Sequence, residues 1–405
     1  MQQLSSEENL IEEFLQFIRE YITKFSQQNN NKEDEINFNL TYDNKVEKSQ
    51  SQIESGIKSE LYNNLKLEDL QQVESLVEKI KMNIFPQNFL RPISIQKQPQ
   101  KCQDICFNND NSLIATTQDS KIILWKFDGK QPIKIQSLQG HDNDVACLLF
   151  SQKTQNTLIS GGGLNDGKIV LWQKKEIEQP WIQINTLPQY QNGGIRCMIF
   201  SKKENFLFVG QSNGFIQIFN VMNNFQQITF YQKPKQYSNK QVFGISLNDS
   251  EQQFVTCHDA NYLVLWQKNN EWQPIRTIED PNFVSFGCRI KFVDQFIIFL
   301  DKMGYLHFLE QSSQTYQFKK KIQVDDKEQD YFNFPISYNN QKRLFVIKHN
   351  KFVHFIKRDD KNNFAKINSI MESNLKLFGK VSEDGSYLAT WCQEMFKIYD
   401  LSKIN

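Results

Sequence analysis

The sequence holds no uninterrupted apolar run of 18 residues, the length that a membrane-spanning helix requires. Its first seven residues have neither the basic region nor the apolar region of a secretory signal. The seven cysteines are scattered, mostly inside apolar runs, and no CxxC pair occurs. We therefore expect buried free thiols in a reducing compartment, and so a cytoplasmic protein, with the nucleus as the alternative and no membrane partner.

The motifs of catalysis and cofactor binding that can be recognised by spacing are also missing. There is no Walker A loop, no GxGxxG and no GxSxG nucleophile elbow. The five histidines lack the spacing of metal ligands. The glycine-rich stretch 161–163 lies between two predicted strands, without a helix to receive a phosphate. The sequence predicts a protein that is not an enzyme and that holds no cofactor or metal.

Charge is divided unevenly along the chain. Residues 1–90 carry nine basic and 16 acidic side chains, whereas 91–405 carry 38 basic and 30 acidic ones. The basic residues of the second part are dispersed, so a nucleic-acid-binding stripe is unsupported. Two interpretations remain: a solvated acidic segment beside an ordinary domain, or electrostatic recognition between the two parts or their partners.

Residues 1–90 read as a helical or coiled-coil segment. A helix follows Ser5 and Glu8, which have the spacing of a capping box, and a polar linker follows at 26–55. A second helix is expected over 57–84, because five apolar residues recur there at alternating spacings of three and four. These helices pack on each other or on the following domain, or form a coiled coil with a second copy of the chain or with a partner. The seam comprises Leu70, Val73, Val77, Ile80 and Ile84.

From residue 102 onward a unit of three or four short strands repeats. Each unit contains an apolar strand with an aromatic residue, and these aromatics recur at intervals of 42 to 47 residues. A period near 40 to 45 with several strands per unit predicts a β-propeller, here with seven blades. The blade-marking aromatics are Trp125, Trp172, Phe219, Trp266, Phe308, Phe355 and Tyr399.

The two ends of the repeat region predict how the ring closes. The last unit begins near Leu375 and provides three strands, whereas a blade needs four. A spare strand, 92–96, precedes the first unit. If it joins the C-terminal blade, no sheet edge is left bare between the first and last blades. We therefore expect an all-β, seven-bladed propeller over 91–405.

One unit resembles the WD40-repeat family. Gly140-His141, followed by Ser160, Asp166 and Trp172, is similar to that family's GH…WD signature. The resemblance implies a structural tetrad of His141, Ser160, Asp166 and Trp172, which are linked by hydrogen bonds and fix the loop before the blade. The other units keep the period but depart from the signature, since only Tyr399-Asp400 retains the aspartate after the aromatic. We therefore expect only this one blade to keep its polar network.

A finer resemblance rests on Trp181 and Trp272, which open the outer strands after Trp172 and Trp266. This arrangement is similar to the targeting propeller of cytosolic iron–sulfur protein assembly. It is also similar to coat and nuclear-pore propellers.

The function expected from the fold is a scaffold or adaptor that docks other proteins. By family resemblance, docking residues lie just inside the first strand of each blade, at Gln103, Arg196 and Phe243, and the N-terminal helices offer a second partner surface. Packing beneath a loop is the alternative role for these three residues. The iron–sulfur assembly, coat or nuclear-pore, and nucleic-acid-associated propellers are the alternative functions.

Overall fold

The computed structural model describes residues 90–176, 179–188, 193–283, 287–313, 315–324, 330 and 334–404. The chain divides between Phe89 and Leu90 into two units, and all described residues belong to the second. The helices expected within 1–90, and the linker at 26–55, lie outside the described residues. In the part of the chain described, no helix is long and apolar enough to cross a membrane.

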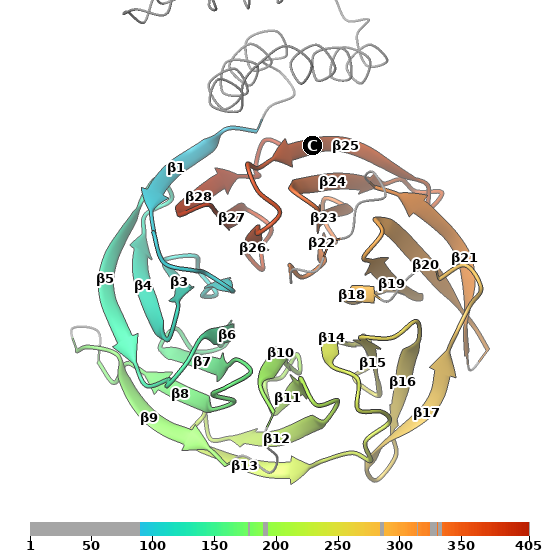
Figure 1. The fold of residues 1–405 in the computed structure, drawn as a ribbon, viewed down its shortest axis with the longest axis horizontal. Helices are drawn as coiled ribbons and strands as arrows, with labels where there is room; N and C mark the ends of the chain where they lie inside the picture. The colour runs from blue at the N-terminus through green and yellow to red at the C-terminus, as the bar shows by residue number, and fades with distance from the viewer. Residues whose placement is uncertain are drawn as a thin grey trace, which may run out of the picture. The chain divides into compact units, whose positions relative to one another are not determined.

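The second unit is a ring of seven four-stranded antiparallel sheets, which confirms the predicted seven-bladed β-propeller (Figure 1). We number the strands of each blade from the channel outward. Blade 1 comprises β2 (Ile105–Phe107), β3 (Leu113–Gln118), β4 (Lys121–Phe127) and β5 (Pro132–Gln139). Blade 2 comprises β6 (Val145–Phe150), β7 (Thr157–Gly162), β8 (Ile169–Gln173) and β9 (Ile182–Leu187). Blade 3 comprises β10 (Ile195–Phe200), β11 (Phe206–Gln211), β12 (Ile216–Met222) and β13 (Gln227–Gln232).

The remaining blades repeat this order. Blade 4 comprises β14 (Val242–Leu247), β15 (Gln253–His258), β16 (Leu263–Lys268) and β17 (Trp272–Ile278). Blade 5 comprises β18 (Gly287–Val293), β19 (Phe296–Asp301), β20 (Tyr305–Ser312) and β21 (Thr315–Gln323). Blade 6 comprises β22 (Ser337–Asn339), β23 (Leu344–His349), β24 (Phe352–Arg358) and β25 (Phe364–Met371).

Blade 7 draws its strands from both ends of the described chain. It comprises β26 (Phe378–Val381), β27 (Tyr387–Cys392), β28 (Met395–Asp400) and, as its fourth strand, β1 (Pro92–Lys97). β1 lies antiparallel to β28, from Pro92 opposite Tyr399 to Lys97 opposite Met395. The spare strand placed at 92–96 by the sequence thus forms the outer edge of the last blade, and the ring is continuous (Figure 1).

The core lies between blades, in seven apolar clusters that each join two neighbouring sheets. Third strands are buried on both faces, so their side chains alternate between the preceding and the following blade. Trp172, for example, packs in the cluster between blades 1 and 2 together with Ala115 and Leu124. Burying two faces of seven sheets accounts for the continuous apolar runs in the sequence.

All seven blade-marking aromatics lie on third strands, but two of them differ from the others in register. In each blade the pairing of the third and fourth strands is interrupted by a bulge in the fourth strand. The third-strand residue directly after this shift in register is Trp172 in blade 2. The equivalent residues are Leu309 in blade 5 and Ile356 in blade 6. Phe308 and Phe355 each lie one residue earlier, so they point to the following blade instead of the preceding one. The other five aromatics share one position in their blades, that of Trp172 in blade 2.

On one side of the ring, residues in or near the turns link every blade to the next. Blades 2 and 3 are joined through Glu204, whose carboxylate accepts hydrogen bonds from Ser151 Oγ and Gln152 N, both at 2.5 Å. Blades 1 and 7 are joined by Asn111 Nδ2 to Asp384 Oδ2, at 2.9 Å. We call this side the turn face. Its remaining links are Gln155–Asp110, Lys202–Asp249, Phe292–Ser246, Arg358–Asp294 and Asn339–Asp384.

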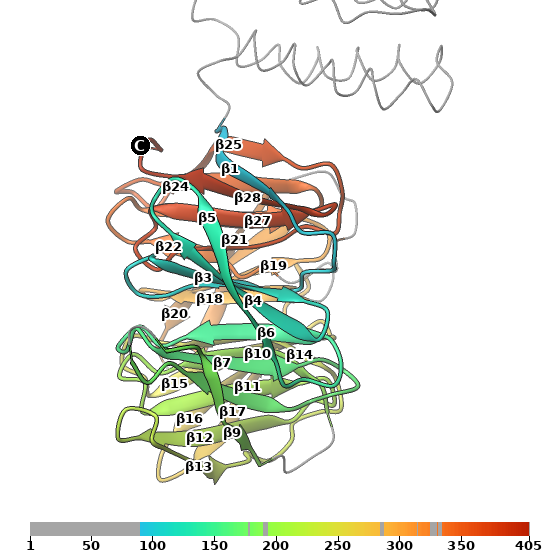
Figure 2. The same cartoon turned by 90° about the vertical axis from the view of Figure 1, so that its left-hand side faces the viewer.

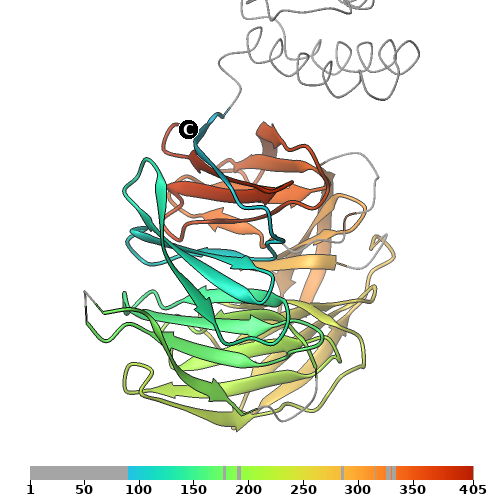
Figure 3. The ribbon, with the colours of Figure 1, turned by 60° about the vertical axis from the view of Figure 1, so that its left-hand side comes forward.

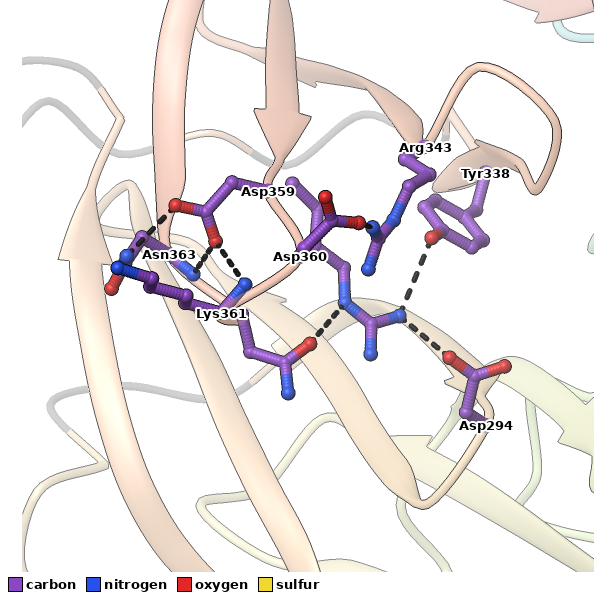
Figure 4. A network of polar contacts seen from close by, with 9 residues as sticks. Asp294, Tyr338, Arg343, Asp359, Asp360, Lys361 and Asn363 are labelled. Atoms are coloured by element: carbon purple, nitrogen blue, oxygen red, sulfur yellow. Dashed lines mark hydrogen bonds and ion pairs between the residues drawn. The ribbon is translucent and has the colours of Figure 1, made fainter.

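The link between blades 5 and 6 is a network around a buried arginine (Figure 4). Arg358 Nη1 lies 2.6 Å from Asp294 Oδ2 and 3.3 Å from the Tyr338 hydroxyl. Its Nε donates to Asn362 Oδ1 at 2.8 Å. Burial lowers the pKa of Arg358, but the hydrogen bonds to Asp294 and Tyr338 outweigh this effect and the pKa is raised. The network holds the turn between third and fourth strands of blade 6 against blade 5.

Candidate functional site

The opposite side of the ring is formed by the loops that precede each blade and by the turns between second and third strands. Seen from its edge, the ring has these loops on one side and the turn face on the other (Figure 2). We call this side the anchored face, because buried polar groups attach its loops to the blades. Its fully described segments include 98–104, 140–144, 163–168, 233–241, 259–262 and 372–377.

In blade 2 the structure brings the four residues of the proposed tetrad together. Trp172 Nε1 donates to Ser160 Oγ at 2.8 Å, and Ser160 Oγ lies 2.7 Å from His141 Nε2. His141 Nδ1 lies 2.5 Å from Asp166 Oδ2. All donors are satisfied when the serine hydroxyl donates to Nε2 and Nδ1–H donates to the aspartate. The chain runs from the third strand to the loop before the blade and to the turn at Asp166.

Two glycines make room for this chain. A Cβ at Gly140 would lie 2.7 Å from the Trp172 ring, and one at Gly162 would lie 2.3 Å from Asp166 Oδ2. Both distances are shorter than carbon atoms tolerate, so neither position accepts a side chain without displacing a member of the tetrad. The Gly-His pair in the sequence therefore has a steric cause as well as a polar one.

Blades 1 and 4 contain related chains that the sequence did not reveal. In blade 1, Trp125 Nε1 donates to Thr116 Oγ1 at 2.9 Å, and Thr116 Oγ1 donates to Gln98 Oε1 at 2.8 Å. In blade 4, Trp266 Nε1 donates to Thr256 Oγ1 at 3.0 Å. Thr256 Oγ1 lies 2.8 Å from Nε2 of His258, a residue of the second strand.

The position of His258 is fixed by the loop before blade 4. Its Nδ1 lies 3.4 Å from the Lys240 carbonyl oxygen of that loop. The ring is fully buried, and burial lowers the pKa of His258 to about 4. The imidazole is therefore neutral at pH 7, with Nδ1–H donating to the carbonyl.

Blade 7 achieves the same attachment with an acid. Glu372, in the loop before the blade, accepts hydrogen bonds through Oε1 from Tyr399 at 2.9 Å and from Thr390 at 3.1 Å. Its Oε2 lies 2.6 Å from Lys397 Nζ. The Glu372 side chain is completely buried. Burial, followed by the Glu372 charge, raises the pKa of Tyr399.

The loop before blade 6 is attached through an ion cluster. Asp330 lies 3.0 Å from Arg289 Nη2 and 2.6 Å from Lys348 Nζ, and all three side chains are buried. It also accepts a hydrogen bond from Asn350 N at 2.9 Å. The two cations outweigh the desolvation of the carboxylate, so the pKa of Asp330 is lowered. The expectation that only one blade keeps its polar network was therefore wrong.

The three candidate docking residues lie at the inner end of this face. Gln103 Nε2 donates to Asp144 Oδ2 at 2.8 Å, which ties two neighbouring loops together. Phe243 is half-buried and packs against the cluster between blades 4 and 5. Arg196 and Phe243 are bulge residues of the first strands, so they stand outside the ladder register. The structure places all three on first strands or just before them, at the channel.

Arg196 has the most exceptional environment of the three. It is half-buried, its Nε is buried without a hydrogen-bond partner, and burial lowers its pKa. Among the described residues no carboxylate forms an ion pair with it. A partly desolvated cation normally has such a partner, because burial without one costs free energy. Nothing in the sequence pattern distinguished Arg196 in this way.

Trp181 and Trp272, which carried the finer resemblance, have a packing role. The backbone of Trp181 exchanges two hydrogen bonds with the side-chain amide of Gln136, which lies on the fourth strand of the preceding blade. Gln232 makes the same pair of hydrogen bonds with Trp272. The two indole rings are buried in the apolar clusters between blades 1 and 2 and between blades 3 and 4, so both side chains contribute to packing between blades. The iron–sulfur and coat or nuclear-pore assignments stay predictions.

The arrangement of possible metal ligands can also be examined in the described part of the chain. No cluster of three or more His, Cys, Asp or Glu side chains suited to a metal ion occurs among the described residues. The six cysteines whose side chains the structure describes are free, and five of them are buried.

Comparisons with known proteins agree with the fold. Residues 132–173, which run from β5 to β8 and contain the tetrad, match the family model "WD domain, G-beta repeat". Echinoderm microtubule-associated protein-like 1 of Homo sapiens is 25% identical over 191 residues, covering 46% of this chain and 21% of that protein. WD repeat-containing protein fzy-1 of Caenorhabditis elegans is 19% identical over 124 residues, covering 31% of this chain and 24% of that protein.

The chain therefore spans about a quarter or less of these two curated relatives. A chain in the crystal structure of the mitotic checkpoint complex superposes with a TM-score of 0.61 at 13% identity. This superposition covers 77% of our chain and 94% of the other. One unit matches the family model and a four-stranded unit is repeated around the whole ring, so the chain is a seven-bladed β-propeller that contains a WD40 repeat at residues 132–173.

Proposed function

We propose that this protein is a non-catalytic scaffold that docks protein partners on the anchored face, with Arg196 as an anchor. WD40 propellers typically serve as protein-interaction scaffolds. The polar networks described above attach the loops of the anchored face to the blades and make this face rigid. Rigidity matters because loops that are already ordered lose less conformational entropy on binding.

The observation that carries the proposal is the unpartnered guanidinium of Arg196. A carboxylate or carbonyl of a partner would satisfy its donors and restore the interaction that burial has removed. Arginine is also among the residues most often found at the energetic centre of interfaces. Phe243, on the next blade, adds partly exposed aromatic surface beside it.

The names of similar proteins support a binding role. One relative is called microtubule-associated, and the solved structure is that of a checkpoint complex. From these names we infer for this chain only that its partners are proteins. The proposal includes a cytoplasmic or nuclear location, in which the free thiols stay reduced.

Affinity purification of the full-length protein, followed by mass spectrometry, tests this function. We expect Arg196→Ala to reduce recovery of specific partners by about 10-fold or more, as for a central hot-spot residue. Arg196→Lys should retain part of the binding, because the charge remains while the planar geometry is lost.

Lys203→Ala is the matched control, since Lys203 is an exposed cation in a turn-face turn. It should leave recovery unchanged. Equal partner recovery by the wild type and Arg196→Ala would contradict docking through Arg196. A protein that retains no specific partner at all would contradict the scaffold function.

A further inference from the structure

The rim of the ring carries isoleucines that point into solvent. Each fourth strand has a bulge opposite the Trp172 position, and the bulged residue leaves the ladder. In five blades this residue is an isoleucine with 40 to 46% of its surface exposed. The five are Ile93, Ile135, Ile184, Ile275 and Ile367.

Two adjoining fourth strands stand out from this pattern. β1 of blade 7 adds Ile95, which is 50% exposed, and β5 of blade 1 adds Ile133, which is 54% exposed. Blades 7 and 1 pack directly on each other, for example through Trp125 and Phe396 with ring centroids 5.4 Å apart. β1 and β5 therefore occupy neighbouring stretches of the rim (Figures 1 and 3).

Positive charge surrounds these four isoleucines. Five exposed cations flank them, three on β1, β4 and β5, one directly before β1 and one in the turn between β4 and β5, and within the described chain none of the five forms an ion pair. Two exposed acids, Asp128 and Glu394, lie in the same stretches. Asp128 is engaged in its own turn, where it accepts hydrogen bonds from Lys130 N and Gln131 N. The cations are Arg91, Lys97, Lys126, Lys130 and Lys134.

Blade 2 provides an internal comparison. Its fourth strand also exposes two isoleucines, Ile182 and Ile184, at 40% each. In the sequence, however, the segment 174–178 that precedes β9 contains two lysines and two glutamates, so it has no net charge. The fourth strand of blade 2 therefore follows a segment without net charge, whereas cations outnumber acids in the exposed residues around β1 and β5.

The chemistry of the ligand follows from this combination of apolar surface and positive charge. Clustered aliphatic side chains rimmed by charge are typical of interaction surfaces. The bulges and lysines hinder pairing with an added strand, so binding would use side chains and not the backbone. A complementary ligand has carboxylates for the cations and apolar side chains for the isoleucines.

We propose that the basic isoleucine rim, made of Ile93, Ile95, Ile133 and Ile135 with their flanking cations, binds an acidic amphipathic segment of a partner protein. This surface lies on the outer edge of the ring and is separate from the anchored face. It therefore gives the scaffold a second docking site.

Fluorescence anisotropy with the full-length protein tests the site. The probe is a labelled 20-residue amphipathic peptide with glutamates on one side and leucines on the other. We expect at least a 10-fold weaker dissociation constant for Ile133→Ser/Ile135→Ser and for Lys130→Glu/Lys134→Glu. Ile182→Ser/Ile184→Ser, the matched control on blade 2, should stay within twofold of the wild type.

Three further outcomes decide the identity of the ligand. Equal binding of a scrambled peptide with the same charge would overturn the apolar contribution. Tighter binding to phosphatidylserine vesicles or to duplex DNA would overturn the assignment to a protein. Arg196→Ala should bind the peptide like the wild type, so failure of this site and failure of docking at Arg196 are separable.

Discussion

Blades 2 and 7 attach the loop before the blade with polar groups that are connected differently. In blade 2, Trp172, Ser160, His141 and Asp166 form a linear chain in which each link depends on the previous one. In blade 7, three donors converge on the single carboxylate of Glu372.

The comparison explains which blades are recognisable in a sequence. In a linear chain each inner member must both donate and accept, which restricts the residue types severely. A carboxylate accepts several hydrogen bonds at once, so its donors can be any hydroxyl or cation of suitable length. Blade 2 therefore carries a motif, whereas blade 7 performs the same task without one.

The largest loss of stability is expected when the Glu372 site of blade 7 loses its cation, Lys397. Lys397→Met leaves the Glu372 carboxylate buried with only two hydroxyl donors. We expect a loss of about 3 kcal/mol in the free energy of unfolding, as for a broken buried ion pair. Urea unfolding followed by tryptophan fluorescence measures it.

Two companion variants keep this prediction specific. Lys397→Met/Glu372→Gln should recover at least half of the loss, because a neutral amide requires no cation. Lys361→Met, at an exposed position, should change stability by less than about 0.5 kcal/mol. A cost of Lys397→Met as small as that of Lys361→Met would contradict the role of the pair.

A direct contrast between the arrangements comes from their hydroxyl groups. Ser160→Ala interrupts the chain and leaves both Trp172 Nε1 and His141 Nε2 without a partner, at a cost of about 2 to 3 kcal/mol. Thr390→Val removes one of three donors to Glu372, at a cost of about 1 kcal/mol. Equal losses in urea unfolding would show that the two arrangements do not differ energetically.

Blade 4 extends the comparison to pH, since its chain ends in a buried neutral histidine. The folded pKa of His258, about 4, lies below the ordinary value of 6.5. Protonation therefore favours the unfolded chain, and the stability present at pH 7 is lost as pH falls from about 6.5 towards 4. We expect a loss of about 1 to 2 kcal/mol between pH 7 and pH 5 from this group.

His258→Gln should remove this part of the pH dependence, because glutamine can donate and accept without titrating. The difference between wild type and variant isolates His258 from other groups. Asp104, whose pKa burial raises to about 6, changes stability in the opposite direction over part of this range and cancels in the difference. Identical pH profiles of the two proteins would contradict the assignment.

The ring could be predicted from the sequence because burial of both sheet faces leaves a strong trace. Continuous apolar strands at a regular period identified all seven blades, and the strand count identified the partner of β28. The register could not be predicted at Phe308 and Phe355. In these two blades the aromatic residue lies one position before the residue equivalent to Trp172, which is Leu309 or Ile356, so the sequence alone does not show which of the two packs on the preceding blade.

The polar networks were predictable only where residue identity is restricted. Gln98, His258 and Glu372 attach loops as His141 does, yet they belong to different residue types, and His258 comes from a strand. That these side chains do the same task follows from where they lie in the folded blade and not from their place in the sequence. The isolation of Arg196 was likewise invisible, because it results from which side chains fail to reach it.

The union of β1 with β28 also has a consequence for how the protein is made. Pro92 meets Tyr399 across 307 residues of chain, so this pairing is the least local one in the ring and carries a large loop-closure entropy. During synthesis β1 leaves the ribosome first among the strands but has no partner until residue 400 follows. Six blades can form before blade 7 is complete. During that interval blades 1 and 6 each expose the apolar face that blade 7 later covers. Chaperone demand and aggregation during translation should therefore be concentrated at the junction of blades 7 and 1.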